Sequence, residues 1–212
     1  MTVRKAVNQL VNESEGEEQA LYVLLGATGL RISEALALET RHLVNGGRTI
    51  EVRQQVHRRK PVIVPYLKTD AGSRDVDVNE EVAEYLRAFI KGKNGLLFKT
   101  RNGTPYLHNN LEQRWLTPRL QAMQIDGKGM GFHAFRRLRK TWLRGKRCPR
   151  RRQQLLDGAQ TGDNVQLYSR LDEELELRLQ EAETVGVGFG VPTYVAPSCS
   201  KISVESEVEI AA

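Results

Sequence analysis

The chain has 212 residues, of which 40% are hydrophobic, and it carries a formal net charge of +6. A chain of this length can bury one sizeable core, and its basic balance favours a polyanionic partner such as a nucleic acid. No apolar run approaches the roughly 20 residues of a membrane span, and no signal-peptide pattern opens the sequence, which excludes membrane and secretory classes.

The first predicted elements are two helices on either side of a glycine. Residues 1–15 have the composition of a frayed lead-in, whereas a leucine-rich face predicts a helix over residues 17–26. Gly29 ends that helix, and the apolar period after it predicts a second helix over residues 32–39. Arg31 would then lie at the N-terminal end of the second helix, where the helix dipole favours an anion.

Three strands are expected next, over residues 49–55, 61–67 and 74–78. The run Asp70-Ala71-Gly72-Ser73 predicts a turn that joins the last two strands into a hairpin. Lys68 would lie at the edge of this hairpin, where its side chain could serve as a mobile acid.

Helices dominate the rest of the chain. Asn79 is placed to cap a helix that runs to about residue 90, and apolar periodicity predicts further helices over residues 109–124, 132–143 and 163–183. The fold class expected from this order is mainly α with a small antiparallel β-sheet (α+β).

The composition changes at residue 184, where glycines and prolines interrupt any regular element and a serine-rich stretch follows. The sequence therefore predicts one domain over residues 16–183 and a flexible C-terminal tail over residues 184–212. The two cysteines and four histidines show no metal-ligand spacing and no disulfide framework. We accordingly expect a cytoplasmic protein with no metal and no cofactor.

Positive charge is concentrated in one segment. Residues 128–170 contain 12 Lys and Arg against 2 Asp and Glu, a balance of +10, whereas the residues after 170 contain 2 against 9, a balance of −7. A basic block of this kind is expected to grip a phosphate backbone, although a solvated basic face would have the same composition. The candidate DNA-binding residues are Arg137, Lys140, Arg144, Lys146, Arg147, Arg150, Arg151 and Arg152.

Five residues stand in a particular order and spacing: Arg31 after Thr28-Gly29-Leu30, then Lys68, then His133 and Arg136 in His133-Ala134-Phe135-Arg136, then Tyr168. This pattern resembles the catalytic domain of the tyrosine recombinases, the phage-integrase family, over roughly residues 17–183. The resemblance implies DNA recombination and DNA integration, as in mobile elements. It also implies double-stranded DNA as the partner, with tetramers formed on paired DNA sites and nucleoid association when bound.

The resemblance also implies a role for each of the five residues. Arg31 and Arg136 would clamp the non-bridging phosphate oxygens, since the planar guanidinium forms paired hydrogen bonds with phosphate. Tyr168 would attack the phosphorus and form a 3′-phosphotyrosyl intermediate. Lys68 would protonate the leaving 5′-oxygen, and His133 would act as base or proton shuttle. Each residue alone also has an ordinary structural interpretation; their joint order favours catalysis.

Three further positions are expected to support this site, namely Glu34, Gly158 and Ala159. The family usually has leucine-glycine-histidine, or tryptophan in place of the histidine, ten residues before the tyrosine. Here Asp157 precedes Gly158, and Ala159 occupies the histidine position. Because the loss of one phosphate donor typically costs about 10²–10³ in rate, the alanine would slow the reaction without abolishing it.

Two alternatives to an active recombinase remain open from the sequence. A non-catalytic DNA-binding relic is favoured by Ala159 and by the short stretch ahead of the first helix, which cannot supply the helical DNA-clamping domain usual in the family. A relaxing topoisomerase would use the same chemistry without a preferred site.

Overall fold

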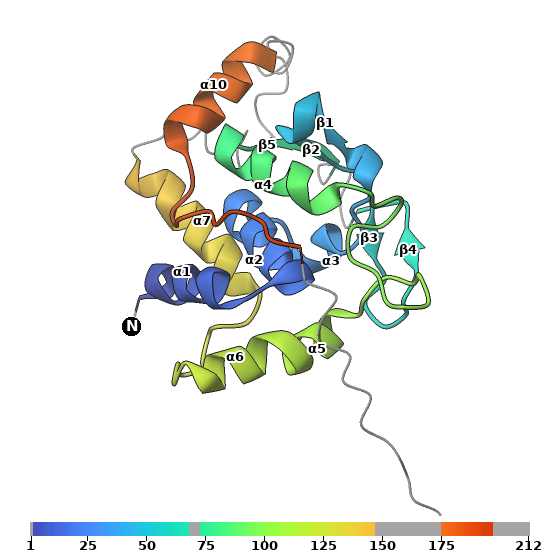
Figure 1. Ribbon diagram of the computed structural model, residues 1–212, viewed down its shortest axis with the longest axis vertical. Helices are drawn as coiled ribbons and strands as arrows, with labels where there is room; N and C mark the ends of the chain where they lie inside the picture. The colour runs from blue at the N-terminus through green and yellow to red at the C-terminus, as the bar shows by residue number, and fades with distance from the viewer. Residues whose placement is uncertain (1, 68–72, 147–174, 197–212) are drawn as a thin grey trace, which may run out of the picture.

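The computed structural model describes residues 2–67, 73–146 and 175–196. Within this part of the chain, helices surround a buried central helix, and small antiparallel sheets lie at one end (Figure 1). The expected fold class, mainly α with a small antiparallel sheet, is confirmed. Among the described residues, no helix is both long and apolar enough to cross a membrane.

The chain begins with a packed helix, α1 (Val3–Glu13), and not with a frayed lead-in. Thr2 accepts a hydrogen bond from the Lys5 N–H at the N-cap, and one face buries Val7 and Leu10 completely. The prediction failed because polar and charged residues separate the apolar ones in this stretch, whereas the apolar residues Ala6, Val7, Leu10 and Val11 recur at helical spacing on one face.

Helix α2 (Gly16–Thr28) is the centre of the fold and is buried along almost its whole length. Helix α3 (Ile32–Ala35) follows, but it is a single turn and not the helix over residues 32–39 that the sequence predicts. The chain leaves helical geometry because Glu39 forms a β-bridge with Leu96, and the Leu97 N–H donates to the Leu38 carbonyl at 2.9 Å.

A three-stranded antiparallel sheet forms in the order β1-β2-β5. It comprises β1 (Leu43–Val44), β2 (Thr49–Val52) and β5 (Arg74–Asp77), with Ile50 opposite Val76. The short 3-10 helices η1 (Thr40–His42) and η2 (Asn45–Gly47) flank β1.

A separate two-stranded sheet pairs β3 (Gln55–Val56) with β4 (Ile63–Val64). The predicted hairpin between residues 61–67 and 74–78 is therefore wrong, because in the described residues β4 pairs with β3 and β5 with β2. Burial explains the choice: β5 places Val76 in the core, whereas Ile63 and Val64 are only partly buried.

Helix α4 (Glu80–Ile90) packs Leu86 and Phe89 into the core. Asn79 stands at its N-cap as predicted, but the side chain makes no capping hydrogen bond. The helix predicted over residues 109–124 is present in three consecutive pieces: α5 (His108–Leu111), the π-helical turn η4 (Glu112–Leu116) and α6 (Thr117–Ala122). The π-turn lies just before Pro118, which has no N–H to continue the regular ladder.

Helix α7 (His133–Gly145) lies against α1 and α2 (Figure 1). The rings of Phe135 and Tyr22 stack across the α2–α7 interface with centroids 5.4 Å apart. The last described helix, α10 (Leu175–Val185), lies beside β5, so the helical prediction over residues 163–183 is confirmed only for its C-terminal part.

Residues 186–196 return across the core and do not behave as a free tail. The Phe189 ring lies so close to Gly26 that a Cβ there would approach within 2.6 Å, and Tyr194 meets Phe89 edge-on at 5.5 Å. Arg4 donates from Nε to the Gly188 carbonyl at 2.6 Å. The predicted flexible tail is therefore wrong for residues 186–196, and residues 197–212 lie outside the described part.

Candidate active site

The turn between α2 and α3 requires glycine for two independent reasons. Gly29 has φ 66° and ψ 23°, a left-handed conformation that glycine adopts without penalty, and its N–H closes α2 on the Leu25 carbonyl at 2.9 Å. A Cβ at Gly29 would also lie 3.1 Å from Cβ of Arg139 on α7. The turn and α7 therefore touch, and any larger residue would push them apart.

This contact brings Arg136 to the turn that leads into Arg31. Arg136 is partly buried on α7, and its Nη1 donates to the Gly29 carbonyl at 2.6 Å. The two arginines are 105 positions apart in the sequence (136 − 31), yet Arg136 bonds a carbonyl only two residues before Arg31. The structure thus brings both predicted phosphate-binding arginines to one end of α2.

Glu34 holds Arg31 through two hydrogen bonds, while part of the Arg31 side chain is open to solvent. Its backbone N–H donates to Glu34 Oε2 at 2.9 Å and its Nη1 to Glu34 Oε1 at 2.7 Å, while 44% of its side chain remains exposed. This arrangement orients the guanidinium and leaves nearly half of the side chain accessible to solvent.

Glu34 is almost completely buried and bonds a second cation. Arg74, at the start of β5, donates from Nη2 to Glu34 Oε2 at 2.8 Å, and its side chain is also buried. Burial by itself would raise the pKa of Glu34, but the hydrogen bond and charge of Arg74, with the two bonds from Arg31, outweigh burial and lower the pKa. Glu34 therefore stays ionised, and the group Arg31–Glu34–Arg74 keeps one net positive charge.

His133 is the first residue of α7 and is exposed. It stands three residues before Arg136, which places both on one face of the helix as the sequence predicts. Within the described part of the chain, its ring makes no hydrogen bond. The role of His133 as base or proton shuttle stays a prediction.

Several predicted site residues lie outside the described residues, and their roles stay predictions. They are Lys68, Arg147, Arg150, Arg151, Arg152, Gly158, Ala159 and Tyr168.

The described members of the basic block lie along or just beyond α7. Arg137 is exposed and bonds the Gly129 carbonyl, and Arg144 and Lys146 are exposed near the C-terminal end of the helix. Lys140 is partly buried and has its own interaction partner. The Lys146 ammonium lies over the Trp142 ring at 4.8 Å.

A second basic cluster was not predicted as part of the site. Arg58, Arg59 and Lys60 form the exposed connection between β3 and β4, and among the described residues none of them makes an ion pair. Tyr66, just after β4, is 65% exposed. The run of three adjacent cations in the sequence was a usable sign of this surface.

The support from Arg74 was also missed, and no sequence pattern reveals it. Arg74 and Glu34 are separated by 40 residues, and a buried arginine on a strand is indistinguishable in sequence from an exposed one.

Comparisons with known proteins give a family match and several solved structures of similar fold. The model of the phage integrase family matches residues 2–174. A search of curated protein sequences finds no match.

Solved structures with a similar fold include three recombination proteins. The Tn1549 transposon integrase in complex with circular intermediate DNA is 24% identical at a TM-score of 0.59, covering 80% of this chain and 64% of that one. The integrase of mycobacterium phage Brujita is 17% identical at 0.57, covering 89% and 58%. XerA recombinase is 17% identical at 0.53, covering 81% and 62%. The chain thus spans less than two thirds of each of these structures.

Proposed function

This chain belongs to the phage integrase family, and from that premise we propose that it carries out site-specific DNA recombination through a 3′-phosphotyrosyl intermediate at Tyr168. The observation that carries the proposal is the meeting of Arg136 and the Arg31 turn at Gly29. Two guanidinium groups at one end of a helix form a binding site for a single phosphodiester, and Glu34 fixes the orientation of one of them.

The proposed reaction conserves phosphodiester bonds. The Tyr168 oxygen attacks the scissile phosphorus, the bond to the 5′-oxygen breaks, and the protein becomes linked to the 3′-phosphate. His133 accepts the tyrosine proton and Lys68 gives a proton to the 5′-oxygen. A 5′-hydroxyl from another strand then attacks the phosphotyrosine and releases Tyr168, so rejoining needs no nucleotide cofactor.

The charge that develops on the phosphate during attack is the main barrier to this chemistry. Arg31 and Arg136 are the groups we assign to it, since the Arg31–Glu34–Arg74 group retains one positive charge and Arg136 adds another. The buried position of Glu34 prevents it from reorienting, which keeps Arg31 ready before the substrate arrives.

Double-stranded DNA is the proposed partner, with α7 and the β3–β4 connection as two basic contact surfaces. The Tn1549 integrase of similar fold is bound to circular intermediate DNA, which supports this choice of ligand. We further propose that the protein works in the cytoplasm, at the nucleoid when bound, and forms tetramers on paired DNA sites.

A covalent trap tests the proposal and lets the protein select its own target. Duplexes of random sequence, nicked so that the short strand bearing the new 5′-hydroxyl diffuses away after cleavage, are incubated with the protein and then denatured. We expect a protein–DNA adduct whose DNA shares a common sequence, and no adduct with Tyr168→Phe. An adduct of equal yield from the phenylalanine variant would overturn Tyr168 as the nucleophile, and adducts without sequence preference would favour a topoisomerase.

A further inference from the structure

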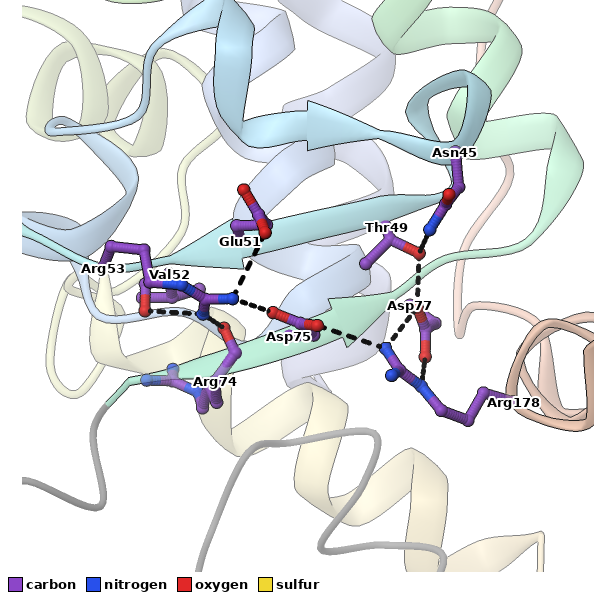
Figure 2. A network of polar contacts seen from close by, with 9 residues as sticks. All are labelled: Asn45, Thr49, Glu51, Val52, Arg53, Arg74, Asp75, Asp77 and Arg178. Atoms are coloured by element: carbon purple, nitrogen blue, oxygen red, sulfur yellow. Dashed lines mark hydrogen bonds and ion pairs between the residues drawn. The ribbon is translucent and has the colours of Figure 1, made fainter. Parts of the chain in front are cut away.

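A bidentate ion pair joins helix α10 to the three-stranded sheet. Arg178 on α10 donates from Nε to Asp77 Oδ2 at 2.8 Å and from Nη2 to Asp77 Oδ1 at 3.0 Å (Figure 2). Only 12% of the Arg178 side chain and 5% of the Asp77 side chain are exposed. A paired, largely dehydrated contact of this kind fixes direction as well as distance.

The sheet holds the Asp77 carboxylate in place by a second set of bonds. Thr49 Oγ1 on β2 donates to Asp77 Oδ1 at 2.7 Å, and Asn45 Nδ2 donates in turn to Thr49 Oγ1 at 3.1 Å (Figure 2). The acceptor for Arg178 is therefore built by the sheet, and α10 docks onto a preorganised group.

The other end of α10 has a more exposed attachment. Glu183 accepts from Arg48 Nη2 at 3.0 Å and from the Glu80 N–H at 2.9 Å, but its side chain is 52% exposed. Solvent weakens such pairs, so the contact between Arg178 and Asp77 is the stronger determinant of where α10 lies.

Strand β5 connects this contact to the arginine site. Asp77 ends β5 and Arg74 begins it, and Arg74 bonds the Glu34 carboxylate that orients Arg31. Three residues along a strand span about 10 Å. One short, hydrogen-bonded strand thus supports the phosphate clamp at one end and α10 at the other.

The position of α10 limits the reach of Tyr168. Leu175, the first described residue of α10, stands seven residues after Tyr168 in the sequence (175 − 168), and seven residues span at most about 25 Å. We propose that Asp77 and Arg178 are positioning residues, which hold α10 on the sheet of the same chain and so keep Tyr168 within reach of the phosphate bound by Arg31 and Arg136. This inference rests on the proposed function, since it assigns the nucleophile to Tyr168.

Asp77→Asn is the test variant, and Asp75→Asn is its matched control on the same strand. The asparagine oxygen can still accept from Thr49 and from Arg178 Nη2, but its amide nitrogen replaces Oδ2 and cannot accept from Arg178 Nε, and the negative charge is lost. Asp75 lies 3.8 Å from Arg178, pairs mainly with Arg53 and is 33% exposed. We expect Asp77→Asn to slow adduct formation on nicked DNA by about tenfold or more, with DNA affinity unchanged, and Asp75→Asn to react like the wild type.

A small external nucleophile distinguishes a variant that misplaces Tyr168 from a variant that damages the phosphate site at Arg31 and Arg136. In a Tyr168→Phe background, hydrogen peroxide at alkaline pH can attack the bound phosphate in place of the tyrosine and release the same 5′-hydroxyl strand. We expect Asp77→Asn to leave this peroxide reaction unchanged, because it does not use Tyr168. Equal loss in both reactions, or a wild-type adduct rate in Asp77→Asn, would overturn the inference.

Two further measurements keep the test decisive. Arg178→Lys retains the charge but only one hydrogen bond, so it should recover part of the adduct rate that Arg178→Gln loses. Hydrogen exchange over residues 175–185 should rise in Asp77→Asn and not in Asp75→Asn, whether or not the chain cleaves DNA. Unchanged exchange would show that the pair does not hold α10, whereas absence of any wild-type adduct would count against the proposed function alone.

Discussion

Arg136 donates a hydrogen bond to the Gly29 carbonyl at 2.6 Å, across 107 residues of sequence. This bond makes the position of one proposed phosphate ligand depend on the turn that carries the other. A displacement of α7 against α2 would therefore separate the two arginines, and the packing of the two helices, which includes the stack of Tyr22 on Phe135, opposes it.

Gly29→Ala should destabilise the protein by about 1–3 kcal/mol, since it adds both left-handed strain and a contact 3.1 Å from Arg139. Gly92→Ala is the matched control, because Gly92 has φ 78° but nothing within 4 Å of the added carbon. Urea unfolding of both variants separates strain from crowding. Equal losses in the two variants would show that the approach of α7 makes no contribution.

Glu34→Gln should cost about 3–5 kcal/mol of folding free energy, because it removes the buried carboxylate that accepts from both Arg74 and Arg31. Thermal unfolding would detect the loss, and Glu39→Gln, at a carboxylate closer to the surface, should cost much less. DNA cleavage should also fall, since the neutral amide cannot orient Arg31 as firmly. Wild-type stability in Glu34→Gln would show that the buried ion pairs of Glu34 do not stabilise the fold.

The lowered pKa of Glu34 predicts a specific acid dependence of stability. A carboxyl group with a folded pKa below its ordinary value near 4.5 stabilises the fold above that value, and the contribution is lost as pH falls through the folded pKa. The wild type should therefore lose more stability than Glu34→Gln as pH drops below about 4.5. If the stabilities of the two proteins fall in parallel over this pH range, the lowered pKa of Glu34 is contradicted.

Arg31→Lys and Arg136→Lys should each reduce strand cleavage heavily, because a single ammonium group cannot make the paired bonds of a guanidinium. Bulk DNA affinity should change little, since the basic block supplies most of the salt-dependent attraction. Single-turnover cleavage and filter binding distinguish the two effects. Cleavage at the wild-type rate by Arg31→Lys would make Arg31 structural.

The β3–β4 connection should contribute to DNA affinity through charge alone. Removing its three cations as Arg58→Gln, Arg59→Gln and Lys60→Gln should lower the slope of log K against log salt by up to about 3, at roughly 0.9 per phosphate contact. Lys5→Gln, an exposed charge on α1, should leave the slope unchanged. An unchanged slope in the triple variant would exclude this surface from DNA contact.

Ala159→His should raise the cleavage rate by roughly 10²-fold by supplying the missing phosphate donor. The comparison is made on nicked DNA with folding checked by circular dichroism. No increase in a folded variant would show that another residue already fills the role.

Features that depend on local periodicity, such as helices, can be predicted from the sequence. Contacts between residues that are distant in the sequence cannot. The i and i+3 spacing of His133 and Arg136 needs only a helix, and α7 supplies it. Strand pairing depends on which apolar residue reaches the core, so the partner of β5 could not be read from the turn residues at 70–73. The buried pairs made by Glu34 and Asp77 join residues 40 and 101 positions apart, which no local pattern encodes.

Residues 186–196 cover part of the core, and this cover can form only after the C-terminal part of the chain has been synthesised. Gly190 bonds Asn8 across 182 residues, and Arg4 bonds Gly188 across 184. Because chains are synthesised from the N-terminus at about 5–20 residues per second, α1 and α2 leave the ribosome roughly ten seconds or more before the segment that covers them. Until then Gly26 lacks the cover of Phe189 and Phe89 lacks that of Tyr194, and the nascent chain presents an apolar surface on which chaperones can act.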